Sequence, residues 1–281
     1  MNRFNQAFHF LLIKYYSQMK NILVPVGSSQ NAVSNLQYAI DLAEEMDAYV
    51  YVVSVFKELS KVGGLTKVNA IIKEDTENRL GEVLSKVNKK DVTVIAHPIK
   101  GGMLDGVARF NKHVPIDLMV LSPRSNSIRE EVFLGNTSGK LLKGTDIPIL
   151  IVPEGAVFKE PSSILMAFKN GSFEKKTLEP LRKFSKNFGT EVHLLHVVTP
   201  ETTEEMKEVS GKVKKMSSSY VVVENATTYQ AVLEHHRDHN ADMLCVIRRK
   251  RGFFKKLWEK NVVLKKEFYT DKPLLVLQVQ D

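Results

Sequence analysis

The chain has 281 residues, of which 43% are hydrophobic and 26% charged, and its formal net charge is +8 at pH 7. This composition excludes a disordered or fibrous chain and is typical of a globular protein with one to three domains. The single cysteine, Cys245, excludes a disulfide framework within the chain, so we expect a reducing compartment, the cytoplasm.

Residues 1–18 differ in character from the sequence that follows. Their apolar stretch, residues 8–13, is too short to span a membrane, and it lacks the long hydrophobic region and cleavage site of a secretory signal. Met19 stands directly before the first predicted strand. We therefore treat residues 1–18 as an extension of uncertain status, exclude it from the fold, and expect no membrane association.

Residues 19–153 alternate apolar runs with amphipathic segments. Continuous apolar runs predict strands that are buried on both faces, at residues 20–26, 49–56, 92–96, 117–121 and 148–152. Apolar residues spaced three and four apart predict helices, at residues 32–43, 67–89, 101–111 and 137–143. Strands that alternate with helices in this way indicate an α/β fold with a parallel, doubly wound sheet.

Residues 154–162 form the predicted linker, and the pattern restarts in a second domain at residues 163–281. Its strands are predicted at residues 163–168, 192–198, 220–223, 242–247 and 273–278. Its helices are predicted at residues 173–188, 203–216, 228–239 and 255–268. Pro180 falls inside the first of these helices and predicts a kink or a late start.

The two halves align as an internal repeat. The first strands match at an offset of 142 residues, as in Ile22 and Ile164. The later elements match at an offset of 125, as in Asp117 and Asp242. Two gap-free blocks separated by a deletion of 17 residues in the middle helix indicate a duplicated domain.

Two segments carry a resemblance to a known family. KNILVPVGSSQNAVSNLQYAIDLA resembles the opening of universal stress protein domains, and the block from GNTS to IPILIVPE resembles their last helix and strand. The resemblance covers about residues 20–278 as a tandem pair. It implies a five-stranded, parallel, Rossmann-like sheet in each domain. It also implies that the two domains pack as the family dimer does, with the final strands 148–152 and 273–278 meeting at a pseudo-twofold axis.

The resemblance also implies a nucleotide site. Many family members bind ATP through a G-x2-G-x9-G-[ST] loop, together with an acidic residue that ends the first strand and a backbone position that ends the second. In the first domain the backbone position is Val55, Gly27 replaces the acid, and only the last loop glycine is retained. The implied ligand is ATP or AMP with Mg²⁺, and the candidate residues are Val55, Ser122, Ser125, Gly135, Asn136, Thr137 and Ser138.

These loop residues allow two interpretations. Their hydroxyl groups and the amides of a helix N-terminus can hold a phosphate. Alternatively, serine and asparagine form the turn and cap the helix without any ligand. The sequence leaves both open.

The second domain departs further from the family pattern. Its loop positions become Arg248, Arg251 and Asn261, and Lys169 replaces the acid. Residues 248–260 hold seven basic side chains and one acidic side chain, so Arg248, Arg249 and Arg251 form a candidate anion patch. Alternatively, the aromatic residues of this segment pack into the domain interface and leave the charges on a solvated face. We favour the latter and do not expect nucleic acid as a partner.

No arrangement of residues indicates catalysis or a metal site. Serine, histidine and aspartate lack the local context of a catalytic triad, and His235 and His239 lack further ligands for a metal. We therefore expect a non-catalytic regulatory or scaffold module with a protein partner. An ATP- or AMP-binding regulator that uses the first domain only is the alternative, and slow ATP hydrolysis is a weaker one. Association is expected through the final strands, within one chain or between chains.

Overall fold

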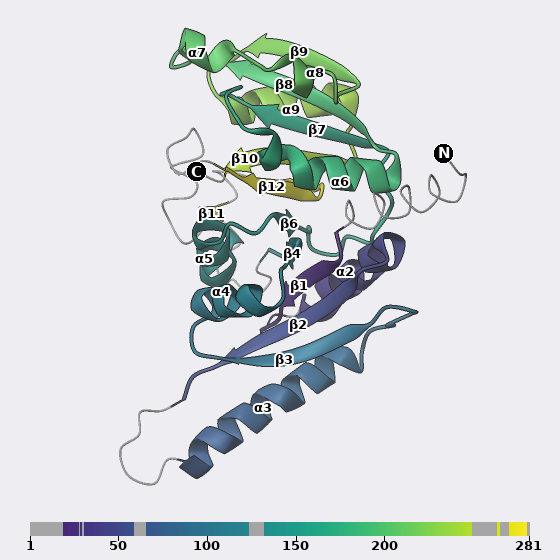
Figure 1. Cartoon of the computed structure of the whole chain (residues 1–281), viewed down its shortest axis with the longest axis vertical. Helices are drawn as coiled ribbons and strands as arrows, with labels where there is room; N and C mark the ends of the chain where they lie inside the picture. Colours follow the sequence, from purple (N-terminus) through teal and green to yellow (C-terminus); the bar gives the residue numbers. More distant parts are fainter. Residues whose placement is uncertain are drawn as a thin grey trace, which may run out of the picture.

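The computed structural model describes residues 19–27, 29, 31–58, 66–123, 132–248, 263–264 and 270–279. Ten strands form one continuous sheet, in the order β3-β2-β1-β4-β6-β12-β10-β7-β8-β9 (Figure 1). The elements from β1 to β6 make the first domain, and those from β7 to β12 make the second. The predicted extension, residues 1–18, lies outside the described residues.

In the described residues, the first domain contributes five strands to the large sheet and has four helices. The strands are β1 (Asn21–Pro25), β2 (Tyr49–Phe56), β3 (Val94–Lys100), β4 (Leu118–Leu121) and β6 (Ile149–Ile151). The helices are α2 (Ala32–Met46), α3 (Thr66–Leu84), α4 (Met103–His113) and α5 (Asn136–Gly144).

The second domain repeats this order with shorter helices. Its strands in the large sheet are β7 (Ser163–Phe168), β8 (Glu191–Val198), β9 (Ser219–Glu224), β10 (Met243–Arg248) and β12 (Leu274–Gln278). Its helices are η1 (Lys175–Leu178), α6 (Glu179–Phe188), α7 (Glu204–Lys207), α8 (Gly211–Lys214) and α9 (Thr228–His239).

Two apolar layers, one on each face of the sheet, form the core. Successive residues of a strand point to opposite faces, so Ile22 belongs to one layer and Leu23 to the other. Helices α2, α3 and α6 contribute to the first layer, and α4, α5 and α9 to the second. No helix in the described part of the chain is long and apolar enough to cross a membrane.

The two domains join through their last strands. β6 pairs antiparallel with β12, with Leu150 opposite Leu275 at the centre, whereas every other pair in this sheet is parallel. Both leucines are fully buried. This seam confirms the prediction that the final strands meet at a pseudo-twofold axis and that the chain forms a tandem pseudo-dimer.

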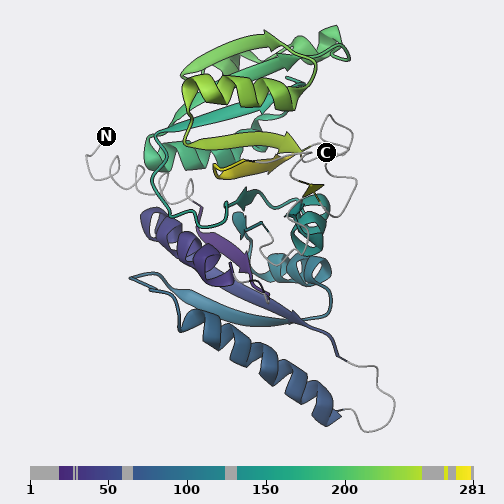
Figure 2. The same cartoon turned by 180° about the vertical axis from the view of Figure 1, so that it is seen from behind.

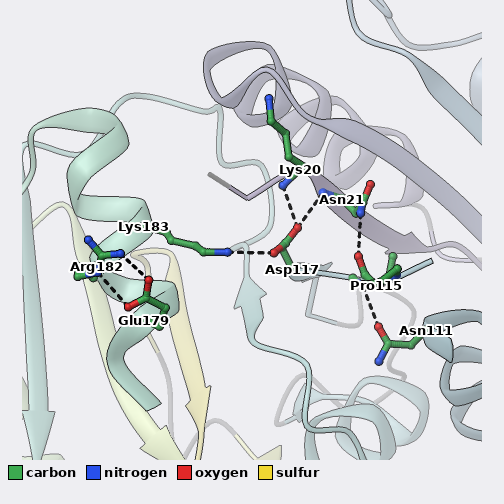
Figure 3. A network of polar contacts seen from close by, with 9 residues as sticks. Lys20, Asn21, Asn111, Pro115, Asp117, Glu179, Arg182 and Lys183 are labelled. Carbon is green, nitrogen blue, oxygen red and sulfur yellow. Dashed lines mark hydrogen bonds and ion pairs between the residues drawn. The ribbon is translucent and has the colours of Figure 1, made fainter. Parts of the chain in front are cut away.

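Equivalent aspartates confirm the repeat at the level of single contacts. Asp117 accepts hydrogen bonds from the main-chain N–H groups of Lys20, at 2.9 Å, and Asn21, at 3.2 Å (Figure 3). Asp242, 125 residues later, accepts from the N–H groups of Ser162 and Ser163 at 2.9 and 3.0 Å. Each aspartate thus accepts main-chain hydrogen bonds at the start of the first strand of its own domain.

The middle helix of the second domain is broken into two short pieces. α3 runs along β2 and β3 (Figures 1 and 2), whereas α7 and α8 have four residues each. The single helix predicted at residues 203–216 is therefore wrong. The backbone near residue 208 approaches Gly171 so closely that a Cβ there would lie 2.3 Å from the Glu208 carbonyl oxygen, and Ser210 accepts from Lys212 N as the cap of α8.

Prolines shift two other boundaries. Pro180 lies in the first turn of α6, where its missing N–H costs nothing, so the helix starts late after the turn η1. β3 continues through Pro98 to Lys100, beyond the predicted end at residue 96, because an edge strand tolerates proline.

A second, smaller sheet connects the domains and was not predicted. β5 (Val132–Leu134) pairs antiparallel with β11 (Val263–Leu264). The helix predicted at residues 255–268 is therefore wrong at residues 263–264, and the rest of that range lies outside the described residues. β5 immediately precedes Gly135, so this pairing fixes the chain just before α5.

Candidate functional site

A cavity of about 840 Å³ opens in the first domain, at the carboxyl ends of β1, β2 and β4. After β1 the chain turns toward β2, and β4 lies on the other side of β1, so the strand order reverses at this point. In an open parallel sheet such a reversal leaves a crevice in which ligands bind. The lining of the cavity includes Val26, Gly27, Gly101, Gly102 and Pro123.

Six of the seven predicted nucleotide-site residues line this one cavity. They are Val55, Ser122, Gly135, Asn136, Thr137 and Ser138. The seventh, Ser125, lies outside the described residues. Val55 comes from β2 and Ser122 follows β4, while the other four begin α5. The fold therefore gathers residues that are about 80 positions apart in the chain.

The N-terminus of α5 presents main-chain donors to the cavity. Its N-cap is Gly135, whose carbonyl oxygen accepts from Gly139 N at 2.8 Å. The first N–H groups of a helix have no partner within the helix, and the first turn here contains no acidic residue. Gly135 has no side chain that could cap these N–H groups. The amides of Asn136 to Ser138, together with the positive end of the helix dipole, therefore suit an anion.

Basic side chains that the sequence analysis did not single out also line the cavity. They are Lys57, Arg79 and Lys140, and Asp105 is the only carboxylate in the described lining. Arg79 also pairs with Asp75 at 3.0 Å. Lys57 directly follows β2, so the rule that ligands sit at strand ends would have found it. Arg79 lies on α3, and only the packing of that helix shows that it reaches the site.

Two glycine positions shape the walls. At Gly27, an added Cβ would meet no atom within 4 Å, so the space beside this residue is open. Gly101 has φ of +101°, a conformation that favours glycine, and its N–H donates to the Phe56 carbonyl at 2.8 Å. The loop from β3 to α4 is thereby held against the end of β2.

The corresponding strand ends in the second domain are occupied by side chains. Lys169, which stands where the first domain has Gly27, pairs with Glu201 at 3.0 Å. The buried His196 ring stacks on Phe168 with centroids 4.9 Å apart. Its Nδ1 lies 2.9 Å from the Tyr220 hydroxyl and its Nε2 lies 3.1 Å from the Lys169 carbonyl oxygen. Burial lowers the pKa of His196.

Arg248, from the candidate anion patch, points into the protein. It is 8% exposed, and its guanidinium donates to the carbonyl oxygens of Lys143 at 2.6 Å and Thr145 at 3.0 Å and to the Gln278 side chain. Arg248 is therefore an interface residue rather than part of an exposed patch, because three internal acceptors take up its donors. Arg249 and Arg251 lie outside the described residues.

Comparisons with known proteins agree with this architecture. Residues 19–153 match the profile of the Universal stress protein family. A universal stress protein of Methanocaldococcus jannaschii is 24% identical over 162 residues, which cover 52% of this chain and 95% of that protein.

Two solved structures span both domains. A universal stress protein from Archaeoglobus fulgidus has a TM-score of 0.67 and 18% identity, and the match covers 94% of this chain and 98% of that one. A functionally unknown protein from Pseudomonas aeruginosa has a TM-score of 0.61 and 12% identity, and the match covers 95% of each chain. At these identities the two structures support the tandem fold alone.

Proposed function

Because residues 19–153 match the Universal stress protein family, we propose that the chain is a non-catalytic regulatory protein of this family whose first domain binds an adenine nucleotide, ATP or AMP. The observation that carries this proposal is the convergence of six predicted residues on one cavity at the N-terminus of α5. The second domain serves as a structural partner that completes the pseudo-dimer.

The size and charge of the cavity support a phosphorylated ligand. Its volume of about 840 Å³ is within the range of small-molecule sites, roughly 300–1,000 Å³. Phosphate oxygens would accept from the amides of Asn136, Thr137 and Ser138, and the Lys140 ammonium would neutralise their charge. The nucleoside would lie toward Val55, at the end of β2.

The residues present suit Mg²⁺ only as a companion of the nucleotide. Mg²⁺ prefers oxygen ligands and is commonly bound through one or two carboxylates together with the phosphates of its nucleotide. Asp105 is the one carboxylate in the described lining. A bound ion would therefore take most of its ligands from phosphate and water, and it would shield the phosphate charge.

A scaffold role for the second domain is the complementary part of the proposal. The Phe168–His196 stack and the Lys169–Glu201 ion pair occupy the strand ends where a nucleoside would sit. This arrangement disfavours binding of a second nucleotide, and we propose that the second domain acts as a scaffold instead.

Calorimetric titration of ATP and of AMP, each with Mg²⁺, into the wild-type protein and the Gly135→Val variant tests the nucleotide proposal. Gly135 is buried and lines the cavity directly before the helix amides, so the added bulk of valine is expected to disturb the proposed phosphate site. We expect about one site per chain in the wild type and loss of binding in the variant. Absence of heat up to millimolar ligand would reject nucleotide binding and leave the scaffold role as the account of the whole chain.

A further inference from the structure

Helix α5, whose first turn forms the candidate anion site, is held at both ends by the second domain. Before the helix, β5 pairs with β11, with Leu134 opposite Val263 and Val132 opposite Leu264. Leu134 is buried and is followed directly by Gly135. A two-stranded sheet with one strand from each domain therefore sets the position of Gly135, the first residue of the candidate anion site.

At the other end of the helix, Arg248 satisfies carbonyl groups that the helix itself leaves without partners. The last four carbonyl groups of a helix lack an N–H partner within it, and Lys143 is one residue from the end of α5. Arg248 donates to the Lys143 carbonyl at 2.6 Å and to the carbonyl of the C-cap Thr145 at 3.0 Å. A cation at this end also complements the negative pole of the helix dipole.

Arg248 is itself fixed rather than free to adjust. It is the last residue of β10 and lies opposite Gln278 of β12, whose side-chain oxygen accepts from its Nε. Both side chains are buried, with exposed fractions of 8% and 5%. Because β12 is also the strand that pairs with β6, the guanidinium is anchored to the seam between the domains.

We propose that Arg248 is a positioning residue for ligand binding in the first domain, through which the second domain sets the affinity of the site. This inference rests on the proposed function. Arg248 does not line the cavity, and it acts through α5, whose nine residues extend about 13 Å from Arg248 to the anion site. A helix fixed at both ends keeps its first amides aimed at one point, which a phosphate requires.

The same geometry implies that the effect is reciprocal. If docking of the second domain improves binding of the nucleotide, the bound nucleotide must stabilise docking by the same factor. Ligand binding is therefore expected to slow amide hydrogen exchange in β5 and β11 as well as in the first turn of α5.

A second contact between the domains supplies a matched control. Lys183 of α6 pairs with Asp117 at 3.3 Å (Figure 3), and Asp117 lies just before β4, away from the cavity lining. The Lys183→Met variant therefore removes an interdomain contact made by α6, whereas Arg248→Met removes the contact that holds α5.

The test compares wild type, Arg248→Met and Lys183→Met by ATP titration with Mg²⁺ and by amide hydrogen exchange of the ligand-free proteins, with α2 as the internal reference. We expect Arg248→Met to weaken ATP binding about tenfold and to speed exchange in α5 but not in α2. Lys183→Met is expected to leave both within about twofold of wild type, because this ion pair is partly open to solvent and does not contact the cavity lining.

Two results would overturn the proposal. Equal ATP affinity in wild type and Arg248→Met would show that Arg248 does not position the site. Equal exchange of α5 and α2 in Arg248→Met, whether unchanged or raised together, would show that the residue contributes to general stability only. If the wild type bound no ATP, the proposed function would fail, and the exchange comparison would still decide whether Arg248 holds α5.

Discussion

The side-chain amide of Asn187 donates a hydrogen bond to the carbonyl oxygen of Glu45 at 3.1 Å, and these two residues occupy the same position in the two repeats, 142 residues apart. Equivalent positions can touch only where they lie close to a pseudo-twofold axis. Asn187 belongs to α6 and Glu45 to α2, and the linker residue Phe158 packs edge-on against Tyr38 of α2 beside them. The chain thus builds within itself the kind of interface that two separate copies would otherwise form.

We predict that the protein is a monomer. The apolar edges of β6 and β12 cover each other within one chain, so no second copy is needed to bury them. Sedimentation equilibrium should give the mass of a single chain, 31.8 kDa, and the midpoint of thermal unfolding should not depend on protein concentration. A midpoint that rises with concentration would show that a second copy stabilises the fold.

Introducing an acid at Gly27 should strengthen binding of adenosine nucleotides. A carboxylate that accepts from a ligand hydroxyl contributes about 1.5 kcal/mol, or about tenfold in affinity. An aspartate fits, because a Cβ at Gly27 has no neighbour within 4 Å. Calorimetry of Gly27→Asp should show tighter AMP binding and no gain for inorganic pyrophosphate, which has no nucleoside to hold. Equal or weaker AMP binding would place the nucleoside elsewhere.

Lys140→Gln should weaken ATP more than AMP. Lys140 lines the cavity one turn into α5, and in the proposed complex its ammonium would neutralise phosphate charge. Removing one exposed charge lowers affinity by about 0.5–1 kcal/mol. Lys112→Gln, on the exposed side of α4 and outside the cavity lining, is the control. Titrations at two salt concentrations check the assignment, since a charge effect shrinks as salt rises. Equal losses of ATP affinity in Lys140→Gln and Lys112→Gln would contradict a direct role of Lys140 in phosphate binding.

Asp117→Ala should destabilise the first domain strongly. It would leave the N–H groups of Lys20 and Asn21 without their acceptor, at about 2–4 kcal/mol for two partly buried donors. Lys183→Met, which removes the ion pair to the same carboxylate and leaves both main-chain hydrogen bonds in place, should cost about 1 kcal/mol. Urea denaturation measures both. Similar losses of stability in both variants would show that Asp117 stabilises the fold through the ion pair rather than through its hydrogen bonds to Lys20 and Asn21.

Stability should fall as the pH decreases through the ordinary titration range of histidine. Burial lowers the pKa of His196 in the folded state, so below about pH 6.5 the unfolded chain binds a proton that the folded chain resists. The stabilisation is thus present above this range and is lost below it. His236, whose pKa burial also lowers, adds to the trend.

His196→Gln isolates this contribution. The variant should be less stable at pH 7.5, since it loses the stacking on Phe168, yet its free energy of unfolding should change less between pH 7.5 and 5 than that of the wild type. Denaturant titrations at both pH values give the comparison. A wild type and a variant with the same pH dependence would show that His196 does not carry the effect.

The fold could be predicted from the sequence because the apolar patterns of its strands and helices are periodic and because the whole pattern occurs twice. Apolar runs marked the buried strands, and the constant offsets of 142 and 125 residues marked the duplication, which in turn placed the last strands at the seam. The short pieces α7 and α8 could not be predicted. Their boundary depends on the close approach of the Glu208 carbonyl to Gly171, which lies far away in the chain.

The candidate site was predictable only in part for a similar reason. Residues that follow strand ends or open a helix carry a local signal, and six of them do line one cavity. Arg79 reaches the same cavity through the packing of α3, which no local pattern reveals. Arg248 stands in a strongly basic segment that favoured a solvated face. Its turn toward the carbonyl groups of Lys143 and Thr145 depends on the seam.

The most direct test is a crystal structure of the full chain grown with saturating ATP and Mg²⁺. We predict one nucleotide per chain, with its phosphates within hydrogen-bond distance of the main-chain amides of Asn136, Thr137 and Ser138 and its adenosine toward Val55. A nucleotide bound in the second domain, or an empty first-domain cavity at saturating ligand, would contradict it.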